Sequence, residues 1–387
     1  MITTPEALHE VVERARGADV VALDTEFVWE RTFYPRLGVV QVGLSEKEVY
    51  LLDTVALNDL APLGALLADS RVVKILHDAV QDLTILRRAT GAAPLNVFDS
   101  QRASGLVRLG ASISLRDLVA EVTGITLPKG ETRTDWCKRP LSEKQIAYAE
   151  DDVRHMPKLY TWLLDKAQSA GRAGWIVEEM QRYDDPSLYA APDPRTQFER
   201  VKARGVGGLS DAQRAVLREV TAWREEEARS SDKTRRSVLA DDALVEIAKR
   251  LPERPQQLSK RIMGDRERTL YGEAIIEAVE RGLAVPANER PRSPRRRPDE
   301  ERIAARVQVV HAGIAGRCMR EGIDPRIIAT KAEIRALIIA GNDRKDRDHL
   351  ILTGWRRAFI GNDVLALLEG EASVGLGSHD DWPEFVV

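Results

Sequence analysis

Short runs of apolar and β-branched residues, separated by polar turns, fill much of the first half of the chain and constrain its fold more than any other feature. Runs of this length and composition are typical of strands that are buried in a sheet. Between and after them, apolar residues recur three and four positions apart, which is typical of helices. The N-terminal half is therefore predicted to be an α/β domain. Its predicted strands cover residues 20–23, 39–42, 49–52 and 72–76.

Helices are predicted between and after these strands, over residues 82–88 and 114–122 and from Ser142 onward. Ser142 and Gln145 have the spacing of a capping box, in which side chains satisfy free backbone N–H groups at the start of a helix. The apolar residues that follow predict one amphipathic helix as far as residue 160. They are Ile146, Ala149, Val153, Met156 and Tyr160.

The second half is predicted to be helical. Ser210 and Gln213 form another capping-box pattern, and Asp241 or Asp242 is expected to cap a helix that Pro252 ends. Apolar spacing predicts the remaining helices of this half. They lie over residues 270–279, around 334–338 and over 363–368.

Composition changes sharply between residues 285 and 298, where four prolines and five arginines occur. The prolines predict a semi-rigid linker. The arginines from Arg290 to Arg297 either bind the phosphates of a nucleic acid or form a solvated part of this linker. The tail from Gly370 is predicted to be loose, with Trp382 and Phe385 able to dock.

The 387 residues, of which 43% are hydrophobic and 31% charged, suffice for two or three domains with buried cores. No apolar stretch approaches the roughly 18 residues of a membrane span, and no secretory signal is visible. Cys137 and Cys318 fit no metal-ligand spacing, so a reducing cytoplasm is expected. The net charge of −3 neither indicates nor excludes nucleic-acid binding, because a carboxylate cluster would offset local basic patches.

Asp24 and Glu26 follow the first predicted strand two residues apart, so their side chains point to the same face. Neighbouring carboxylates repel each other unless a cation lies between them, and hard divalent cations prefer oxygen ligands. The pair therefore predicts a site for Mg²⁺ or Mn²⁺, although a solvated strand end would have the same sequence.

Two further acidic patterns occur later in the chain. Asp82 comes five residues after His77, at the start of the helix that follows the fourth predicted strand; on its own it would be a helix-capping acid. Tyr148 and Asp152 are four residues apart and share a face of the third predicted helix, where the phenol and carboxylate could hold a water. On its own this pair would be the solvated edge of a helix.

Taken together and in this order, the three patterns resemble the exonuclease motifs of the DEDD superfamily, in its tyrosine-bearing branch. Further segments are similar to ribonuclease D, so the resemblance covers nearly the whole chain. The spacing in this family selects Asp82 and Asp152 rather than their neighbours Asp78 and Asp151, and Asp78 is the more serious rival. The similar segments are residues 24–27, 32–37, 41–43, 98–99, 129–131, 135–136, 139–141, 354–357 and 368–370.

The resemblance implies a 3′→5′ exonuclease whose catalytic residues are Asp24, Glu26, Asp82, Tyr148 and Asp152. The four carboxylates would hold two divalent metal ions, Mg²⁺ or Mn²⁺. Tyr148 would orient the attacking water rather than act as a full general base, because the ordinary pKa of a phenol is about 10. Hydrolysis would release nucleoside 5′-monophosphates.

The implied substrate is RNA, in particular a tRNA precursor with a 3′ extension. Phe27 is expected to stack on or wedge against a base, and His77 to contact a phosphate or sugar; the alternatives are core packing for Phe27 and a supporting hydrogen bond for His77. No membrane and no required protein partner are indicated, and the expected location is the cytoplasm. A DNA exonuclease and a catalytically silent RNA-binding scaffold are the alternative functions.

The resemblance also divides the chain into an α/β, ribonuclease H-like exonuclease domain over residues 1–195 and two all-α domains. The latter resemble the helicase-and-RNase-D C-terminal (HRDC) domain. The first is expected over residues 205–285 and the second, more diverged, over 299–370, with the linker 286–298 between them and the tail 371–387 behind. Both helical domains are expected to grip structured RNA and place its 3′ end at the catalytic domain.

Overall fold

The computed structural model of the chain consists of two compact units, each of which is discontinuous in sequence. Unit 1 contains Met1–Phe27, Leu37–Tyr189 and Pro298–Val387, and unit 2 contains Val28–Arg36 and Ala190–Arg297. Lys129 and the arginines of the linker beyond residue 292 lie outside the described residues. The structure describes residues 1–128, 130–131, 134–260, 262–292, 298–341, 349–377 and 381–386.

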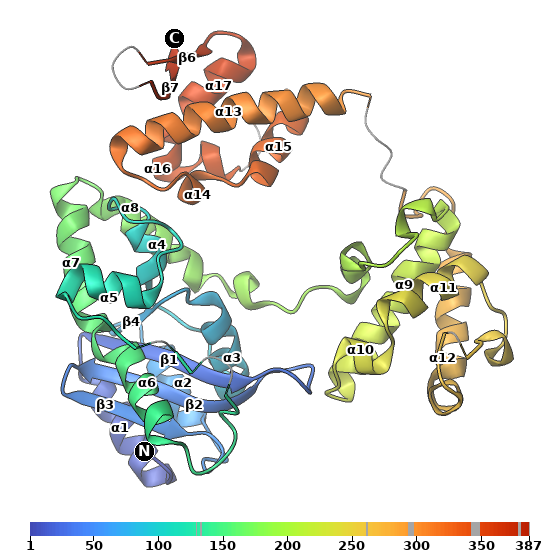
Figure 1. Ribbon diagram of the computed structural model, residues 1–387, viewed down its shortest axis with the longest axis horizontal. Helices are drawn as coiled ribbons and strands as arrows, with labels where there is room; N and C mark the ends of the chain where they lie inside the picture. Colours follow the sequence, from blue (N-terminus) through green and yellow to red (C-terminus); the bar gives the residue numbers. More distant parts are fainter. Residues whose placement is uncertain are drawn as a thin grey trace. The chain divides into compact units, whose positions relative to one another are not determined.

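A five-stranded sheet forms the centre of unit 1, in the order β3-β2-β1-β4-β5 (Figure 1). β1 pairs parallel with β4 and β4 pairs parallel with β5, whereas β2 and β3 are antiparallel. The four predicted strands are confirmed, and the three-residue β5 is an additional one. The strands are β1 (Val20–Val28), β2 (Arg36–Ser45), β3 (Glu48–Asp53), β4 (Val73–Leu76) and β5 (Val97–Asp99).

The helices of the N-terminal region pack on this sheet and on each other. Helix α6 lies against β3 and α7 against β4, while α2 packs against both α1 and α3. Helices α3 and α5 confirm the predictions for residues 82–88 and 114–122. The bounds are α1 (Pro5–Arg16), α2 (Ala61–Leu67), α3 (Val80–Thr90), α4 (Ser100–Ser104), α5 (Leu115–Thr123), α6 (Glu143–Arg154), α7 (Met156–Ser169) and α8 (Ala173–Gln181).

The prediction of a single helix from Ser142 to residue 160 is wrong. The capping box of Ser142 and Gln145 is present, but α6 ends one residue before His155 and α7 begins one residue after it. Pro157 lies in the first turn of α7, where its missing N–H breaks no helical hydrogen bond. The apolar spacing continues across the break, so periodicity alone predicts one helix.

Unit 2 is a helical bundle in which α9 packs against α11 and α12. The loop between β1 and β2 belongs to this unit: the Phe33 ring packs against the core of the bundle, with the Arg235 guanidinium 4.7 Å from its centre. The backbone N–H of Tyr34 donates a hydrogen bond to Asp232. The helices are α9 (Asp211–Ser230), α10 (Arg235–Val238), α11 (Asp241–Arg250) and α12 (Asp265–Ala284).

Of the two side-chain caps predicted for helices of unit 2, the cap of α9 is confirmed and the cap of α11 is wrong. Ser210 and Gln213 form the capping box at the start of α9. The predicted cap of α11 by Asp241 or Asp242 is wrong, because Ala240 occupies the capping position. The Asp241 carboxylate is engaged elsewhere: it accepts a hydrogen bond of 2.6 Å from a guanidinium N–H of α9.

The C-terminal region returns to unit 1 as a second set of helices. Its long first helix packs against α14 and α15. No helix within the residues that the structure describes, in either unit, is long and apolar enough to cross a membrane. The helices are α13 (Glu300–Glu321), α14 (Pro325–Ile328), α15 (Lys331–Ala340), α16 (Gly354–Arg356) and α17 (Asn362–Glu369).

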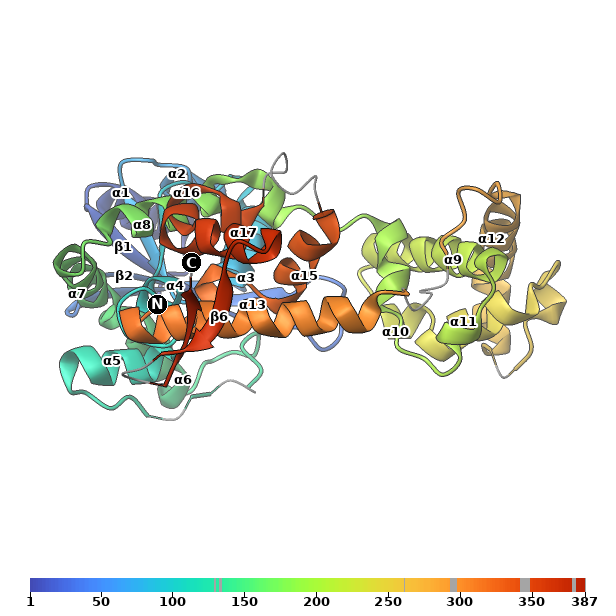
Figure 2. The same ribbon diagram turned by 90° about the horizontal axis from the view of Figure 1, so that it is seen from above.

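The prediction of a loose tail is wrong for its described residues. β6 (Ser373–Leu376) pairs antiparallel with β7 (Pro383–Val386), and this hairpin lies on α13 (Figure 2). A Cβ atom added to Gly313 of α13 would lie 2.6 Å from the Phe385 ring, so the ring docks where α13 has no side chain. The docking of Phe385 is thus confirmed. The glycine that permits it, Gly313, lies far from Phe385 in the sequence.

Candidate active site

Polar residues gather where the parallel strands of unit 1 end. Ala22 of β1 stands opposite Ile75 of β4, which stands opposite Phe98 of β5. Residues one to four positions beyond this row therefore meet at one edge of the sheet. They are Asp24 on β1, the turn of residues 77–79 after β4, and Asp99 at the end of β5.

Three of the predicted carboxylates form a tight cluster at this edge. Asp24, Glu26 and Asp152 each offer a carboxylate oxygen, and these oxygens all lie within 4.8 Å of one another. Asp24 and Glu26 point to the same face of β1, as residues two apart on a strand do. Helix α6 covers that face and contributes Asp152, together with Tyr148 one turn earlier on the helix.

The position of α6 depends on close backbone approach to β2. A Cβ atom on Gly43 would lie 2.8 Å from the carbonyl oxygen of Val153 and 3.0 Å from its Cβ. Only glycine permits this distance, and Val153 is the residue that follows Asp152. The packing distance between α6 and β2 therefore determines the distance between the carboxylates of Asp152 and Asp24.

Asp82 approaches the cluster from the other side of β1. It is buried in the first turn of α3, and its Oδ1 accepts a hydrogen bond from the Thr25 hydroxyl. Thr25 lies between Asp24 and Glu26, so its side chain points to the opposite face. Asp82 therefore stands beside the three clustered carboxylates rather than among them. The helix-capping alternative for Asp82 is excluded, because the capping position of α3 is Ala79.

Mutual repulsion and burial raise the pKa values of these carboxyl groups. Burial, followed by repulsion from Asp152 and Asp82, raises the pKa of Glu26 to about 8. Burial likewise raises the pKa of Asp152 to about 7 and that of Asp82 to about 6, and it raises the pKa of Asp24 well above its ordinary value. A divalent cation among these oxygens would remove the repulsion, and a set of carboxylate ligands suits a hard cation such as Mg²⁺ or Mn²⁺.

Tyr148 is arranged to remain protonated. Burial is the main cause that raises the pKa of its hydroxyl, and the nearby charges of Asp152, Glu26 and Asp24 raise it further. The hydroxyl hydrogen-bonds to Asp152. Gly130 lies against the ring, since a Cβ atom there would come within 2.7 Å of it. A fixed, neutral phenol beside the cluster can hold a water by hydrogen bonding.

The two predicted substrate contacts lie at the same edge. Phe27 is half-buried on β1, directly after Glu26. Both ring nitrogens of His77 face protein groups: Nδ1 is 2.9 Å from the Ser100 hydroxyl, and Nε2 is 2.9 Å from the carbonyl oxygen of Ile113. This geometry favours the supporting hydrogen bonds for His77, and a contact with substrate remains a prediction for both residues.

Sequence reasoning missed two residues that support the site. Asp99 accepts hydrogen bonds from the backbone N–H groups of Asp78 and Ala79, which lead into α3. Gln41 is fully buried on β2, with its amide nitrogen 3.5 Å from Asp24. Both residues fall within segments that resemble ribonuclease D, but no local pattern assigns them a partner.

Comparison with protein families gives two matches. A family described as 3′-5′ exonuclease matches residues 1–168, and the HRDC domain family matches residues 213–279. The first match contains all seven predicted site residues. The second lies within the first predicted HRDC domain.

Several proteins and solved structures are similar over nearly the whole chain. Ribonuclease D of Desulfotalea psychrophila is 37% identical over 360 residues, which cover 93% of this chain and 96% of that protein. Ribonuclease D of Gluconacetobacter diazotrophicus is 37% identical over 380 residues, covering 97% and 94%. The crystal structure of Escherichia coli RNase D, described as an exoribonuclease involved in structured RNA processing, superposes with a TM-score of 0.82 at 26% identity, covering 96% and 98%.

Proposed function

Since the chain belongs to the ribonuclease D family and is a 3′→5′ exoribonuclease, we propose that it shortens structured RNA by hydrolysis at a site for two divalent metal ions. Its fold class, a ribonuclease H-like exonuclease domain followed by a helical region with an HRDC domain, agrees with the family. The observation that carries the proposal is the convergence of four carboxylates and one tyrosine at the ends of parallel strands.

The carboxylates have distinct parts in this proposal. Asp24, Glu26 and Asp152 are the inner ligands, because their carboxylate oxygens lie within 4.8 Å of one another and could bind the same ion. Asp82 adds a fourth carboxylate to the metal site from helix α3. The hydrogen bond that its carboxylate accepts from the Thr25 hydroxyl holds it in position. Divalent ions held there would supply a nucleophilic water and neutralise the charge that develops on the departing 3′ oxygen.

Tyr148 has the part of orienting the attacking water. Because its pKa is raised, the hydroxyl keeps its proton and can accept a hydrogen bond from the water while donating one to Asp152. This fixes the direction of the water without a change of protonation on the phenol. The proton that the water loses is therefore accepted by a carboxylate or by solvent.

The proposed natural substrate is a tRNA precursor with a short unpaired 3′ extension. The support is twofold: the E. coli relative is described as acting in structured RNA processing, and an HRDC domain accompanies the catalytic domain. Phe27 is proposed to stack on the terminal base, since it is half-buried beside Glu26. Hydrolysis would release one nucleoside 5′-monophosphate per cycle.

The test uses a 5′-labelled tRNA with extra 3′ nucleotides and a DNA strand of the same sequence as its extension. We expect a ladder that shortens from the 3′ end in Mg²⁺ or Mn²⁺, no shortening in EDTA, and slower cleavage of the DNA. Tyr148→Phe should lower kcat by roughly 100-fold, which is the size of effect expected when a group that orients the attacking water is lost. Tyr160→Phe, which removes the hydroxyl of a half-buried tyrosine on α7, is the matched control and should cleave normally. Equal rates on DNA would contradict the RNA preference, and activity in EDTA would contradict the metal site.

A further inference from the structure

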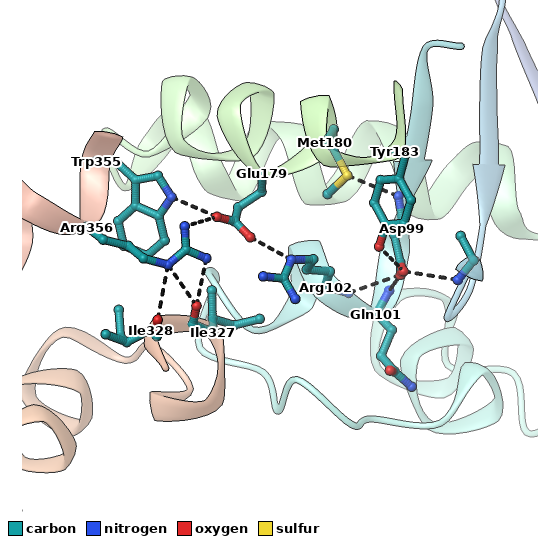
Figure 3. A network of polar contacts seen from close by, with 11 residues as sticks. Asp99, Gln101, Arg102, Glu179, Met180, Tyr183, Ile327, Ile328, Trp355 and Arg356 are labelled. Atoms are coloured by element: carbon teal, nitrogen blue, oxygen red, sulfur yellow. Dashed lines mark hydrogen bonds and ion pairs between the residues drawn. The ribbon is translucent and has the colours of Figure 1, made fainter. Parts of the chain in front are cut away.

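The C-terminal helical region is joined to the catalytic domain by a buried carboxylate. Glu179 of α8 is 3% exposed and lies between two guanidinium groups, that of Arg102 on α4 and that of Arg356 on α16 (Figure 3). Each guanidinium approaches the carboxylate to 2.5 Å, and the indole N–H of Trp355 donates a further hydrogen bond of 3.0 Å to it. Arg356 also donates to the backbone carbonyls of Ile327 and Ile328 in α14.

Arg102 connects this carboxylate to the edge of the sheet. It lies on α4, whose capping residue is Asp99. The Asp99 carboxylate accepts hydrogen bonds from the backbone N–H of Arg102 and from the hydroxyl of Tyr183 (Figure 3). It also accepts hydrogen bonds from the backbone N–H groups of Asp78 and Ala79. One buried side chain therefore ties α4 to the turn from which α3 begins.

A second route reaches the same turn from α14. Asp324 accepts a hydrogen bond of 2.8 Å from the backbone N–H of Ala111, and Arg326 donates one of 2.6 Å to the Ser112 hydroxyl. The next residue, Ile113, offers its carbonyl oxygen to Nε2 of His77. The C-terminal region thus holds the 111–113 segment, which in turn holds the first residue of the turn.

The turn of residues 77–79 depends on such outside support. Asp78 has a φ of +61°, a left-handed conformation that is uncommon for residues other than glycine. The capping residue of α3, Ala79, has no side chain that could satisfy the first N–H groups of the helix. Asp99 instead holds the two residues just before the helix, by accepting hydrogen bonds from the backbone N–H groups of Asp78 and Ala79, and the two ring contacts of His77 anchor the start of the turn. The position of Asp82, three residues into α3, follows from the geometry of this turn.

We propose that the C-terminal helical region is a brace for the metal site, and that Arg356, Glu179, Arg102 and Asp99 are positioning residues that fix Asp82 through the turn of residues 77–79. The resemblance to HRDC domains instead implies that this region grips RNA. The contacts it makes with α4, α8 and the 111–113 segment are with the catalytic domain itself. The inference rests on the proposed function, because it takes Asp82 as part of the metal site.

The experiment compares Arg356→Gln with the wild-type chain, with Arg357→Gln as control and Arg356→Lys as the conservative variant. Arg357 is the exposed neighbour of the buried Arg356, so its substitution removes the same charge from the next position in the chain without touching Glu179. Mn²⁺ affinity is measured by calorimetric titration at a temperature far below the unfolding transition. Amide hydrogen exchange of residues 77–83 is measured in the metal-free protein. Steady-state rates are measured on a single-stranded tetraribonucleotide, which is too short to need a distant RNA grip.

A brace predicts that Arg356→Gln weakens Mn²⁺ binding by roughly tenfold, as loss of a residue that orients a ligand does. It also predicts faster exchange at the amides of Asp78 and Ala79, and a lower kcat with little change in KM on the tetranucleotide. Arg356→Lys should recover part of the loss, and Arg357→Gln should behave as wild type. A region that only grips RNA would leave Mn²⁺ affinity, exchange and tetranucleotide cleavage unchanged, and that result would overturn the proposal.

Two safeguards keep the outcome decisive. If Arg356→Gln does not fold, Arg326→Ala removes the exposed contacts of Arg326 with Ser112 and with Asp324, and it should give smaller changes of the same kind in exchange and in Mn²⁺ affinity. If neither variant alters them while the wild type binds Mn²⁺, the brace is refuted and the metal site stands. If the wild type itself binds no Mn²⁺, the proposed function fails, and the brace with it.

Discussion

At the scale of single residues, the charge of the carboxylate cluster has a direct consequence for stability. In the metal-free protein the pKa of Glu26 is raised from 4.5 to about 8, that of Asp152 from 3.8 to about 7 and that of Asp82 from 3.8 to about 6. A folded-state pKa above the unfolded one stabilises the protein fully below the unfolded value, and this contribution is lost as pH rises through the folded value. The metal-free chain should therefore lose stability between about pH 4 and pH 8.

The measurement is thermal unfolding in EDTA from pH 5.5 to 8.5. We expect the Tm of unit 1 to fall by several degrees over this range, because each carboxyl group that loses its proton adds a buried negative charge to the cluster. Glu26→Gln should flatten the slope, because it removes a carboxyl group whose pKa is raised to about 8 by burial and by repulsion from Asp152 and Asp82. Added Mn²⁺ should raise Tm more at pH 8 than at pH 5.5, since the ligands bind as carboxylates. An unchanged slope in Glu26→Gln would show that the pH effect arises elsewhere.

The choice between Asp82 and Asp78 is also a matter of single residues. Asp82 is buried beside Thr25, whereas the Asp78 side chain is exposed on a residue with φ of +61°. Asp82→Asn keeps an oxygen for the Thr25 hydroxyl but removes the charge, so kcat should fall by at least roughly 100-fold. Asp78→Gly removes the backbone strain and should keep activity within about twofold. Loss of activity in Asp78→Gly with activity kept in Asp82→Asn would reverse the assignment.

At the scale of elements, helix α6 is the part of the site most sensitive to packing. Gly43→Ala would place a Cβ atom 2.8 Å from the Val153 carbonyl oxygen, so α6 must move outward. Overpacking of this kind costs about 1–3 kcal/mol. A shift of the helix moves Asp152 and Tyr148 together, and kcat should fall by roughly tenfold or more.

The matched control for Gly43→Ala is Gly174→Ala in α8. No heavy atom lies within 4 Å of a Cβ atom at Gly174, and alanine is the better helix former there. This variant should be as stable as wild type or slightly more so, with unchanged kcat. Chemical unfolding and steady-state rates measure both effects. Wild-type kcat in Gly43→Ala would mean that the reach of Asp152 does not depend on this contact.

Elements could be predicted from sequence where a local signal defines them. The capping boxes at Ser142 and Ser210 each require only two side chains three residues apart, and both are formed. The break at His155 could not be predicted from spacing, because apolar residues continue through it. Strand β5 is three residues long and has too few positions for an alternating pattern. The face shared by Asp24 and Glu26 follows from the strand pleat, whereas the approach of Asp82 through Thr25 depends on tertiary packing.

At the scale of the whole molecule, sequence order is a poor guide to which parts belong together. The chain was expected to form consecutive domains, yet residues 298–387 return to the unit that contains the N-terminus. The contacts responsible are single buried side chains far apart in sequence. Glu179 pairs with Arg356, and Arg172 donates to the backbone carbonyls of Leu106 and Glu321. A carboxylate and a guanidinium 177 positions apart carry no local pattern that identifies them as partners.

This arrangement predicts that the C-terminal region stays bound after the chain is cut. A specific protease site inserted between Arg292 and Pro298 lets the linker be cleaved in the folded protein. The two fragments should elute together in size-exclusion chromatography and keep the tetranucleotide activity. They are held by the buried contacts of Glu179 and Arg172, and removing one partner of a buried ion pair costs about 3–5 kcal/mol.

Cleavage of the Arg356→Gln chain provides the contrast, because it leaves the Glu179 carboxylate with one guanidinium instead of two. Its fragments should separate at protein concentrations where the wild-type fragments remain together. The cut Arg357→Gln chain should behave as wild type, since that side chain is exposed and lies outside the pair. Separation of the wild-type fragments would mean that the covalent linker, rather than the buried contacts, keeps the C-terminal region on the catalytic domain.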